Sequence, residues 1–267
     1  NMAFALLDDM SACRLTPSPV SFNIAISAAD NGRLWPSALD FLQVMKERFI
    51  RPNAITFTAT ITACGRSMQW EMALALVKEL SDSGSSLSEP VAHSAAASAC
   101  EKGHQWERAL VLLDDMKLFG PQPNIITYNA VISACDKGQQ WSHALGLLEE
   151  LRGPGCVTGP PNHISFNATI SACGRAGRWD AGLALLRTMG SQKLRANTVT
   201  YNTTISAMER CSHWTSALIL LAEMRPCQIE INTITRNAAI AACERASEWQ
   251  SAVALLESDL GAPSADS

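Results

Sequence analysis

Seven short polar side chains recur along this chain about every 35 residues, each within a stretch rich in small and aliphatic residues. Amide and hydroxyl groups gain nothing for helix propensity at such positions, so each requires a hydrogen-bond partner. Two interpretations are open: the side chains cap free main-chain N–H groups of a helix, or they bind a ligand with the same period. The residues are Asn23, Thr58, Ser94, Asn129, Asn167, Asn202 and Asn237.

Basic side chains recur with the same period near the end of these stretches. One cation per repeat suits a polynucleotide with one phosphate per nucleotide, and it equally suits a helix C-terminus, where each is worth roughly 0.3 to 1 kcal/mol. Four of the cations directly follow an acidic residue, but neighbours on a helix point about 100° apart, so the charges cancel only in part. The first repeat has Asn31 in place of the cation. The basic residues are Arg66, Lys102, Lys137, Arg175, Arg210 and Arg245.

Residues that could catalyse a reaction or hold a metal form no recognisable set. The five histidines lie at unrelated positions of the repeat, and no zinc-deaminase, phosphate-loop or nucleophile-elbow motif is present. Five cysteines share one position, which predicts small buried residues on equivalent helices and neither a zinc site nor a disulfide framework. We therefore predict no enzyme activity for this chain, and no metal or cofactor. These cysteines are Cys64, Cys100, Cys135, Cys173 and Cys243.

The overall charge and hydropathy of the chain bear on whether it binds nucleic acid or a membrane. A net charge of −4 gives no general attraction to nucleic acid or to acidic membranes, so any affinity for a polyanion must come from local arrangement. No uninterrupted apolar run approaches the roughly 18 residues of a membrane span, so no membrane partner is expected.

All seven tryptophans fall at one position of the repeat. They indicate where the helices that would carry the recurring polar and basic residues begin and end. An apolar helical stretch precedes each tryptophan, and a second one, such as WSHALGLLEEL with Ala144 and Leu148 on one face, begins at it. Glycines such as Gly138 are expected to end the first helix in the left-handed conformation. The tryptophan is expected to wedge between its own repeat and the next, with base stacking as the alternative. The seven are Trp35, Trp70, Trp106, Trp141, Trp179, Trp214 and Trp249.

Each repeat is therefore predicted to be a helical hairpin, and the chain to be an all-α array of seven of them. Residues 1–18 resemble the second half of a preceding repeat, which suggests that the chain is cut from something longer. The predicted repeats are 19–53, 54–89, 90–124, 125–162, 163–197, 198–232 and 233–267.

The order of motifs distinguishes between families of helical hairpin repeats. The tetratricopeptide pattern places tryptophan in the first helix, whereas here it opens the second. The VTYN opening, the basic residue with Gly that ends the first helix, the ALxLLxxM second helix and the closing Pro-Asn resemble the pentatricopeptide repeat family of RNA-binding proteins. This resemblance covers essentially the whole chain, as a P-type array of about seven and a half repeats. It implies a right-handed α-solenoid of antiparallel hairpins, in which each repeat meets one nucleotide of single-stranded RNA.

The resemblance also implies functions for three positions in each repeat. The second residue is always a β-branched aliphatic, and in similar proteins it sandwiches a base between adjacent repeats; burial at the helix start is the alternative. The fifth residue, which is the polar one introduced above, pairs with the last residue to choose the base. The second residues are Val20, Ile55, Val91, Ile126, Ile164, Val199 and Ile234. The last residues are Asn53, Glu89, Asn124, Asn162, Asn197, Asn232 and Ser267.

These pairs predict a target sequence. Because Asn can donate and accept, Asn with Asn fits a pyrimidine, and by the resemblance it favours cytosine with uracil tolerated. The shorter hydroxyl of Ser or Thr leaves room for a purine, so Ser94 with Asn124 favours adenine. Thr58 with Glu89 departs from the usual pairs and indicates only a purine. The predicted target is 5′-pyrimidine-purine-A-C-C-C-pyrimidine-3′.

From the resemblance we expect a sequence-specific RNA-binding protein that acts in organellar RNA processing, editing, stability or translation. The compartment, mitochondrion or chloroplast, follows from the family alone, and protein partners would act through the parent chain. Two alternatives remain: a tetratricopeptide-like scaffold that binds a protein or peptide, and the RNA-targeting part of a larger RNA-processing enzyme. Polar and basic residues repeated at fixed positions favour a regular polymer as the ligand.

Overall fold

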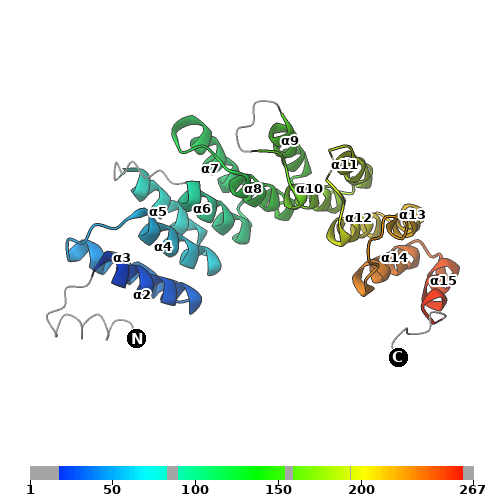
Figure 1. Cartoon of the computed structure of the whole chain (residues 1–267), viewed down its shortest axis with the longest axis horizontal. Helices are drawn as coiled ribbons and strands as arrows, with labels where there is room; N and C mark the ends of the chain where they lie inside the picture. Colours follow the sequence, from blue (N-terminus) through cyan, green and yellow to red (C-terminus); the bar gives the residue numbers. More distant parts are fainter. Residues whose placement is uncertain (1–17, 83–89, 154–158, 193, 261–267) are drawn as a thin grey trace. The chain divides into compact units, whose positions relative to one another are not determined.

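The computed structural model describes residues 18–82, 90–153, 159–192 and 194–260, with side chains as far as residue 255. Every regular element in these ranges is a helix, as Figure 1 shows, so the fold class is all-α, as predicted. None of the described helices is both long and apolar enough to cross a membrane. The helices are α2 (Pro19–Asn31), α3 (Trp35–Glu47), α4 (Ala54–Arg66), α5 (Trp70–Asp82), α6 (Pro90–Lys102), α7 (Trp106–Phe119), α8 (Ile125–Lys137), α9 (Trp141–Arg152), α10 (His163–Arg175), α11 (Trp179–Ser191), α12 (Thr198–Arg210), α13 (Trp214–Met224), α14 (Thr233–Arg245) and α15 (Trp249–Leu260).

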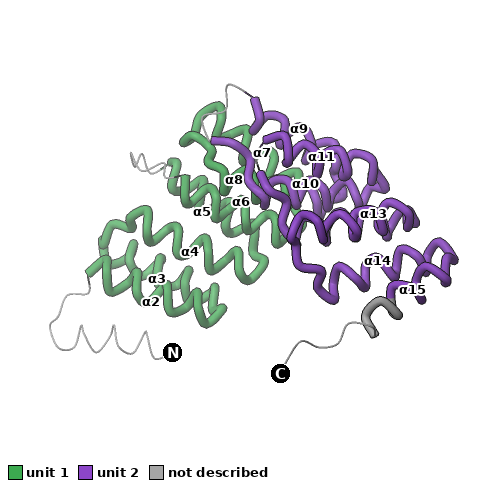
Figure 2. Tube along the Cα trace, turned by 45° about the vertical axis from the view of Figure 1, so that its right-hand side comes forward, with its two compact units in different colours: residues 1–134 green, residues 135–267 purple. Residues whose placement is uncertain are grey.

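The chain forms two compact units, residues 1–134 and 135–267, which are coloured separately in Figure 2. In the first unit, α2, α4 and α6 pack side by side, and each forms a hairpin with the helix that follows it. The second unit repeats this arrangement, with α10, α12 and α14 in a row and α11, α13 and α15 as their partners. Each unit is therefore a solenoid of stacked helical hairpins, with the first helices in one continuous layer.

The aromatic residue at the fourth position anchors the first helix in the core. Phe22 is fully buried and packs with Ile26, one turn later, against Phe41 and Met45 of α3. Phe166 takes the equivalent place in the second unit, among Ile170, Leu185 and Met189. Because residues four and five adjoin, this anchor fixes the part of the helix that carries the recurring polar side chain.

The turn between the two helices of a hairpin differs from the sequence prediction. The glycine at this turn is not left-handed: Gly32 has a φ of −80°, and the residue after each such glycine takes positive φ instead, at Arg33, His104 and Gln139. The prediction for Gly138 was therefore wrong by one residue. At Gly103 the reason for glycine is space, because an added Cβ would lie 2.5 Å from Cδ1 of Trp70 in the preceding repeat.

Trp70, Trp141 and Trp179 pack against the repeat that follows, as expected of a wedge between repeats. Besides the contact of Trp70 with Gly103, the guanidinium of Arg178 lies 4.7 Å from the ring of Trp141. The rings of Trp179 and His213 lie 4.1 Å apart. Trp249 opens the last described helix and is 67% exposed. The burial of these tryptophans thus depends on the next hairpin.

The five periodic cysteines are buried, as predicted. Burial raises the pKa of Cys64, Cys100 and Cys173 to about 11 and that of Cys135 to about 12. These thiols stay protonated at neutral pH and act as small packing residues on the first helices.

Candidate nucleic-acid interface

The β-branched aliphatic at the second position of each repeat is exposed. The exposed fractions lie between 53% and 64%, in contrast to the buried aromatic two residues later. Burial at the helix start, the alternative considered from sequence, is therefore wrong. The fifth residue follows three positions later, on the same helix face, so each first helix presents an aliphatic group beside a polar one. The exposed aliphatics are Val20, Ile55, Val91, Ile126, Ile164, Val199 and Ile234.

The polar side chains at the fifth position lie inside the first helices and are not N-caps, so the capping interpretation was assigned to the wrong residue. The caps are instead the last residues of the preceding repeats. The Oδ1 atoms of Asn53, Asn162, Asn197 and Asn232 accept main-chain N–H groups at the starts of α4, α10, α12 and α14. Asn124 accepts the N–H of Thr127 at 2.9 Å in the same way. With the amide oxygen engaged, the outward group of these last residues is the NH₂ donor.

A buried hydroxyl at the third position connects the fifth residue of the preceding repeat with the last residue of that repeat, and sequence reasoning missed it. Thr56 Oγ1 donates to Oδ1 of Asn23 at 2.6 Å and lies 2.9 Å from Oδ1 of Asn53. Thr235 joins Asn202 and Asn232 in the same way. A signal was present in the sequence, since each repeat has a hydroxyl or small residue at this position.

The same contacts recur with a hydroxyl at the fifth position. Ser94 is 5% exposed, and its Oγ lies 2.8 Å from Oγ1 of Thr127 and 3.2 Å from Oδ1 of Asn124. The fifth and last residues of this repeat therefore lie together, as a shared contact with one nucleotide requires.

Two fifth-position atoms have no hydrogen-bond partner among the described residues. They are Oγ1 of Thr58 and Oδ1 of Asn167, and both are buried. An unsatisfied buried polar atom is costly, so a hydrogen-bond partner at either of these two atoms would be favourable. The last residues Glu89 and Ser267, which were expected to pair with Thr58 and Asn237, lie outside the described residues.

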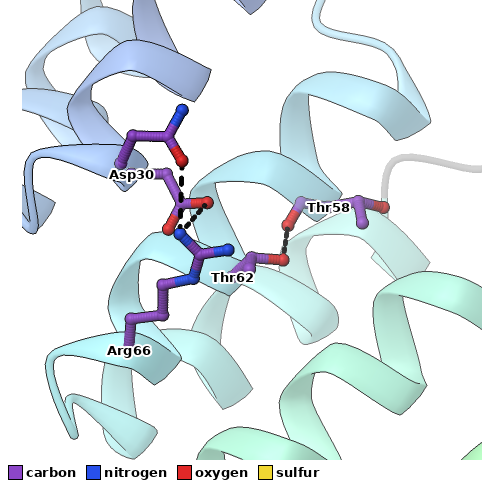
Figure 3. A network of polar contacts seen from close by, with 5 residues as sticks. Asp30, Thr58, Thr62 and Arg66 are labelled. Atoms are coloured by element: carbon purple, nitrogen blue, oxygen red, sulfur yellow. Dashed lines mark hydrogen bonds and ion pairs between the residues drawn. The ribbon is translucent and has the colours of Figure 1, made fainter.

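Among the periodic cations, Arg66, Arg175 and Arg245 each form an ion pair with an acidic residue of the preceding repeat. Arg66 Nη1 reaches Oδ2 of Asp30 at 3.3 Å, as Figure 3 shows. The same nitrogen lies 3.4 Å from Oδ1 of Asn31. Arg175 pairs with Asp136 at 3.2 Å, and Arg245 with Glu209 at 3.4 Å. Asp136 and Glu209, which directly precede the cations of their own repeats, thus neutralise the cation of the next repeat.

Burial raises the pKa of the Asp136 carboxyl, whereas the charge of Arg175 and a hydrogen bond from Ser171 oppose the rise. The loss of hydration therefore outweighs the ion pair at this carboxylate. Arg210, which lies farther away, also favours the charged form of Asp136.

Lys102 and Arg210 take part in no ion pair within the described part of the chain. The position that supplies the acid elsewhere is glycine in their preceding repeats, at Gly65 and Gly174. Both glycines are places where first helices pack closely: an added Cβ on Gly174 would lie 2.8 Å from Cα of Ala207. Close packing there removes the acidic partner and leaves the next cation unpaired.

Within the described residues, no group of three or more His, Cys, Asp or Glu side chains is arranged to hold a metal ion. The recurrent side chains offer hydrogen bonds, apolar contact and positive charge, which suit binding.

Comparison with known families and structures agrees with the repeat pattern. Models of the pentatricopeptide repeat match residues 5–67 and 107–176, 161–210, and 55–85 and 199–225. Together these matches cover most of the chain. A comparison with curated protein sequences found no match.

Solved pentatricopeptide structures have the same fold. Maize PPR10 is 16% identical with a TM-score of 0.51, and PPR10 in complex with an 18-nt psaJ RNA element is 25% identical with a TM-score of 0.54. Both alignments cover 96% of this chain but only 45% and 40% of the other, so the chain spans less than half the length of these proteins. The pentatricopeptide domain of Arabidopsis thaliana protein-only RNase P 1, in complex with tRNA, is 15% identical over 64% of this chain and 89% of that domain, with a TM-score of 0.51. The family matches, the hairpin array and the recurring VTYN and tryptophan positions together show that this chain belongs to the pentatricopeptide repeat family.

Proposed function

We propose that this chain binds single-stranded RNA in a sequence-specific manner, with one nucleotide to each repeat. The observation that supports this most strongly is the repeated pair on each first helix, an exposed β-branched aliphatic beside a short polar group. The aliphatic side chains offer apolar contact to any base, and the polar groups can read the edge of an unpaired base. PPR10 and the domain of protein-only RNase P 1 were both solved with RNA.

The energies involved require several repeats to act together. A net hydrogen bond contributes about 0.5 to 1.5 kcal/mol, which is roughly a 2- to 12-fold preference for one base. Seven repeats with such preferences distinguish a heptamer, whereas one repeat does not. The fifth and last residues would supply these bonds, and the unpaired cations would add attraction to phosphate that is independent of sequence.

The proposed target is 5′-pyrimidine-purine-A-C-C-C-pyrimidine-3′. The test is a competition between this heptamer and a scrambled heptamer of equal composition, both labelled and titrated with the chain. We expect tighter binding to the predicted order. Equal affinity for the two would reject base reading by the repeats.

Filter binding with single-stranded and duplex RNA distinguishes an RNA-binding chain from a peptide-binding scaffold. Filter binding at low salt should retain single-stranded RNA in preference to a duplex of the same sequence, since paired bases hide the edges that the repeats would read. Absence of RNA retention would favour the peptide ligand.

We further propose, from family membership, a role in organellar RNA processing, editing, stability or translation. A fluorescent fusion of the parent protein should then colocalise with mitochondria or chloroplasts. The parent protein is also proposed as the place for any catalytic domain, because the described side chains of this array suit binding.

A further inference from the structure

We propose that the buried third-position hydroxyl orients the fifth-position amide of the preceding repeat and thereby makes that repeat prefer cytosine to uracil. The inference rests on the proposed RNA-binding function. Its clearest instance is Thr235, which acts on Asn202 of the sixth repeat.

The geometry fixes which atom of the Asn202 amide faces Thr235. Thr235 Oγ1 donates to Oδ1 of Asn202, and the Asn202 amide nitrogen donates to Oδ1 of Asn232 at 3.4 Å. Rotating the amide by 180° would place two acceptor oxygens, those of Asn202 and Asn232, against each other. Thr235 is fully buried, so water does not compete for its hydroxyl.

The first repeat shows the same arrangement. Thr56 Oγ1 accepts the main-chain N–H of Asn53 at 3.3 Å and donates to Oδ1 of Asn23 at 2.6 Å. In both repeats the amide oxygen is engaged. A hydrogen of the NH₂ group remains for a ligand, in Asn202 the one that is not donated to Asn232.

A fixed NH₂ donor distinguishes the two pyrimidines. On the edge used for base pairing, cytosine presents an unprotonated N3 that accepts a hydrogen bond, whereas N3 of uracil carries a hydrogen. An amide free to rotate could turn its oxygen to the uracil N3–H, but an amide held by Thr235 cannot do so without breaking that bond. The hydroxyl is therefore a positioning residue for base choice, although it does not touch the base.

The chain provides a matched control at Thr200, the third residue of the sixth repeat. Its N–H and hydroxyl contact Oδ1 of Asn197 at 2.9 and 3.0 Å, as those of Thr235 contact Asn232 at 2.9 and 2.8 Å. However, Oδ1 of Asn167 in the preceding repeat has no hydrogen-bond partner among the residues that the structure describes, so Thr200 does not hold that amide. Thr200→Val therefore removes the same capping contact without releasing a fifth-position amide.

The experiment measures the dissociation constants of two heptamers that differ only in cytosine or uracil at the sixth nucleotide. We expect the wild-type chain to prefer cytosine by roughly 2- to 12-fold, the range for one hydrogen bond. Thr235→Val should bring this ratio to about one, while Thr235→Ser should keep it. Thr200→Val, whose capping contact is with Asn197 of the fifth repeat, should leave unchanged the cytosine-to-uracil ratio of heptamers that differ at the fifth nucleotide. Thermal unfolding of the two valine variants checks that both fold alike.

An unchanged ratio in Thr235→Val, an equal loss in Thr200→Val, or no wild-type preference at this nucleotide would each overturn the orienting role while leaving RNA binding in place. Failure of the wild-type chain to bind any single-stranded heptamer would overturn the proposed function as well.

Discussion

Asp136 is a residue whose charge is opposed by its surroundings, because burial raises the pKa of its carboxyl. The unfolded chain releases this proton at a lower pH than the folded chain does, so unfolding becomes more favourable as pH rises from the ordinary pKa of Asp through the raised one. Asp136→Asn has no carboxyl to ionise at this position and therefore avoids this loss of stability at higher pH. In urea unfolding from about pH 3 to about pH 7, the free energy of unfolding of the variant should rise relative to wild type. A relative gain by wild type over this range would show that the ion pair with Arg175 dominates.

The buried cysteines make a prediction about reactivity. A thiol with a pKa of about 11, such as Cys64 or Cys173, is ionised in only about one molecule in ten thousand at neutral pH. Cys227 is exposed. Brief treatment of the native chain with iodoacetamide should therefore label Cys227 and spare Cys64 and Cys173, as peptide mass mapping would show. Comparable labelling of all three would contradict the described burial.

The sequence showed which side chains recur on the first helices but not what they contact. Period and residue type identified the second, fifth and last positions. Capping was one interpretation of the fifth residue, because Asn is a good N-cap and occurs at both the fifth and the last position of a repeat. Only the exact start of each helix shows that last residues such as Asn53 and Asn232 are the N-caps. The role of Thr235 was not predictable, because its partner Asn202 belongs to the preceding repeat, 33 residues earlier.

At the scale of elements, the closest approach of two first helices depends on glycine. An added Cβ on Gly174 of α10 would lie 2.8 Å from Cα of Ala207 in α12, whereas one on Gly146 of α9 would meet nothing within 4 Å. Gly174→Ala should therefore lower the free energy of unfolding by about 1 to 3 kcal/mol through overpacking. Gly146→Ala, the control, should raise it by about 0.5 to 1 kcal/mol. Urea unfolding measures both, and a stabilised Gly174→Ala variant would show that the helices can separate at little cost.

The helices and their order could be predicted from the sequence, because amphipathic periodicity marks the helices and each tryptophan marks the start of a second helix. The detail of the turn did not follow. Gly103 has the same position in its repeat as Gly138, where the sequence predicted a left-handed backbone. The structure shows instead that Gly103 makes room for Trp70 of another hairpin, and no local sequence pattern reveals a contact of that kind.

At the scale of the whole molecule, the ion pairs between repeats should weaken the dependence of RNA binding on salt. Six phosphate contacts would give a slope of log affinity against log salt near −4, at about −0.7 per contact. Because Arg66, Arg175 and Arg245 are already paired, we expect a slope clearly shallower than −4. Lys102→Gln should reduce the magnitude by about 0.7, and Arg175→Gln should change it less. A slope near −4 would show that RNA opens the ion pairs, and one near zero would assign the cations to the helix ends.

The most direct test of base reading by individual repeats is a change of specificity at one nucleotide. Asn202 lies beside Asn232, a pair that favours cytosine by the family resemblance, whereas Ser94 with Asn124 favours adenine. Asn202→Ser should convert the sixth repeat from the first kind to the second. The measurement is the dissociation constant of the wild-type and variant chains for two heptamers that carry cytosine or adenine at the sixth nucleotide. We expect wild type to prefer cytosine and the variant to prefer adenine, by roughly 2- to 12-fold each. An equal loss of affinity for both RNAs, with the order of preference unchanged, would contradict the assignment of one base to each repeat.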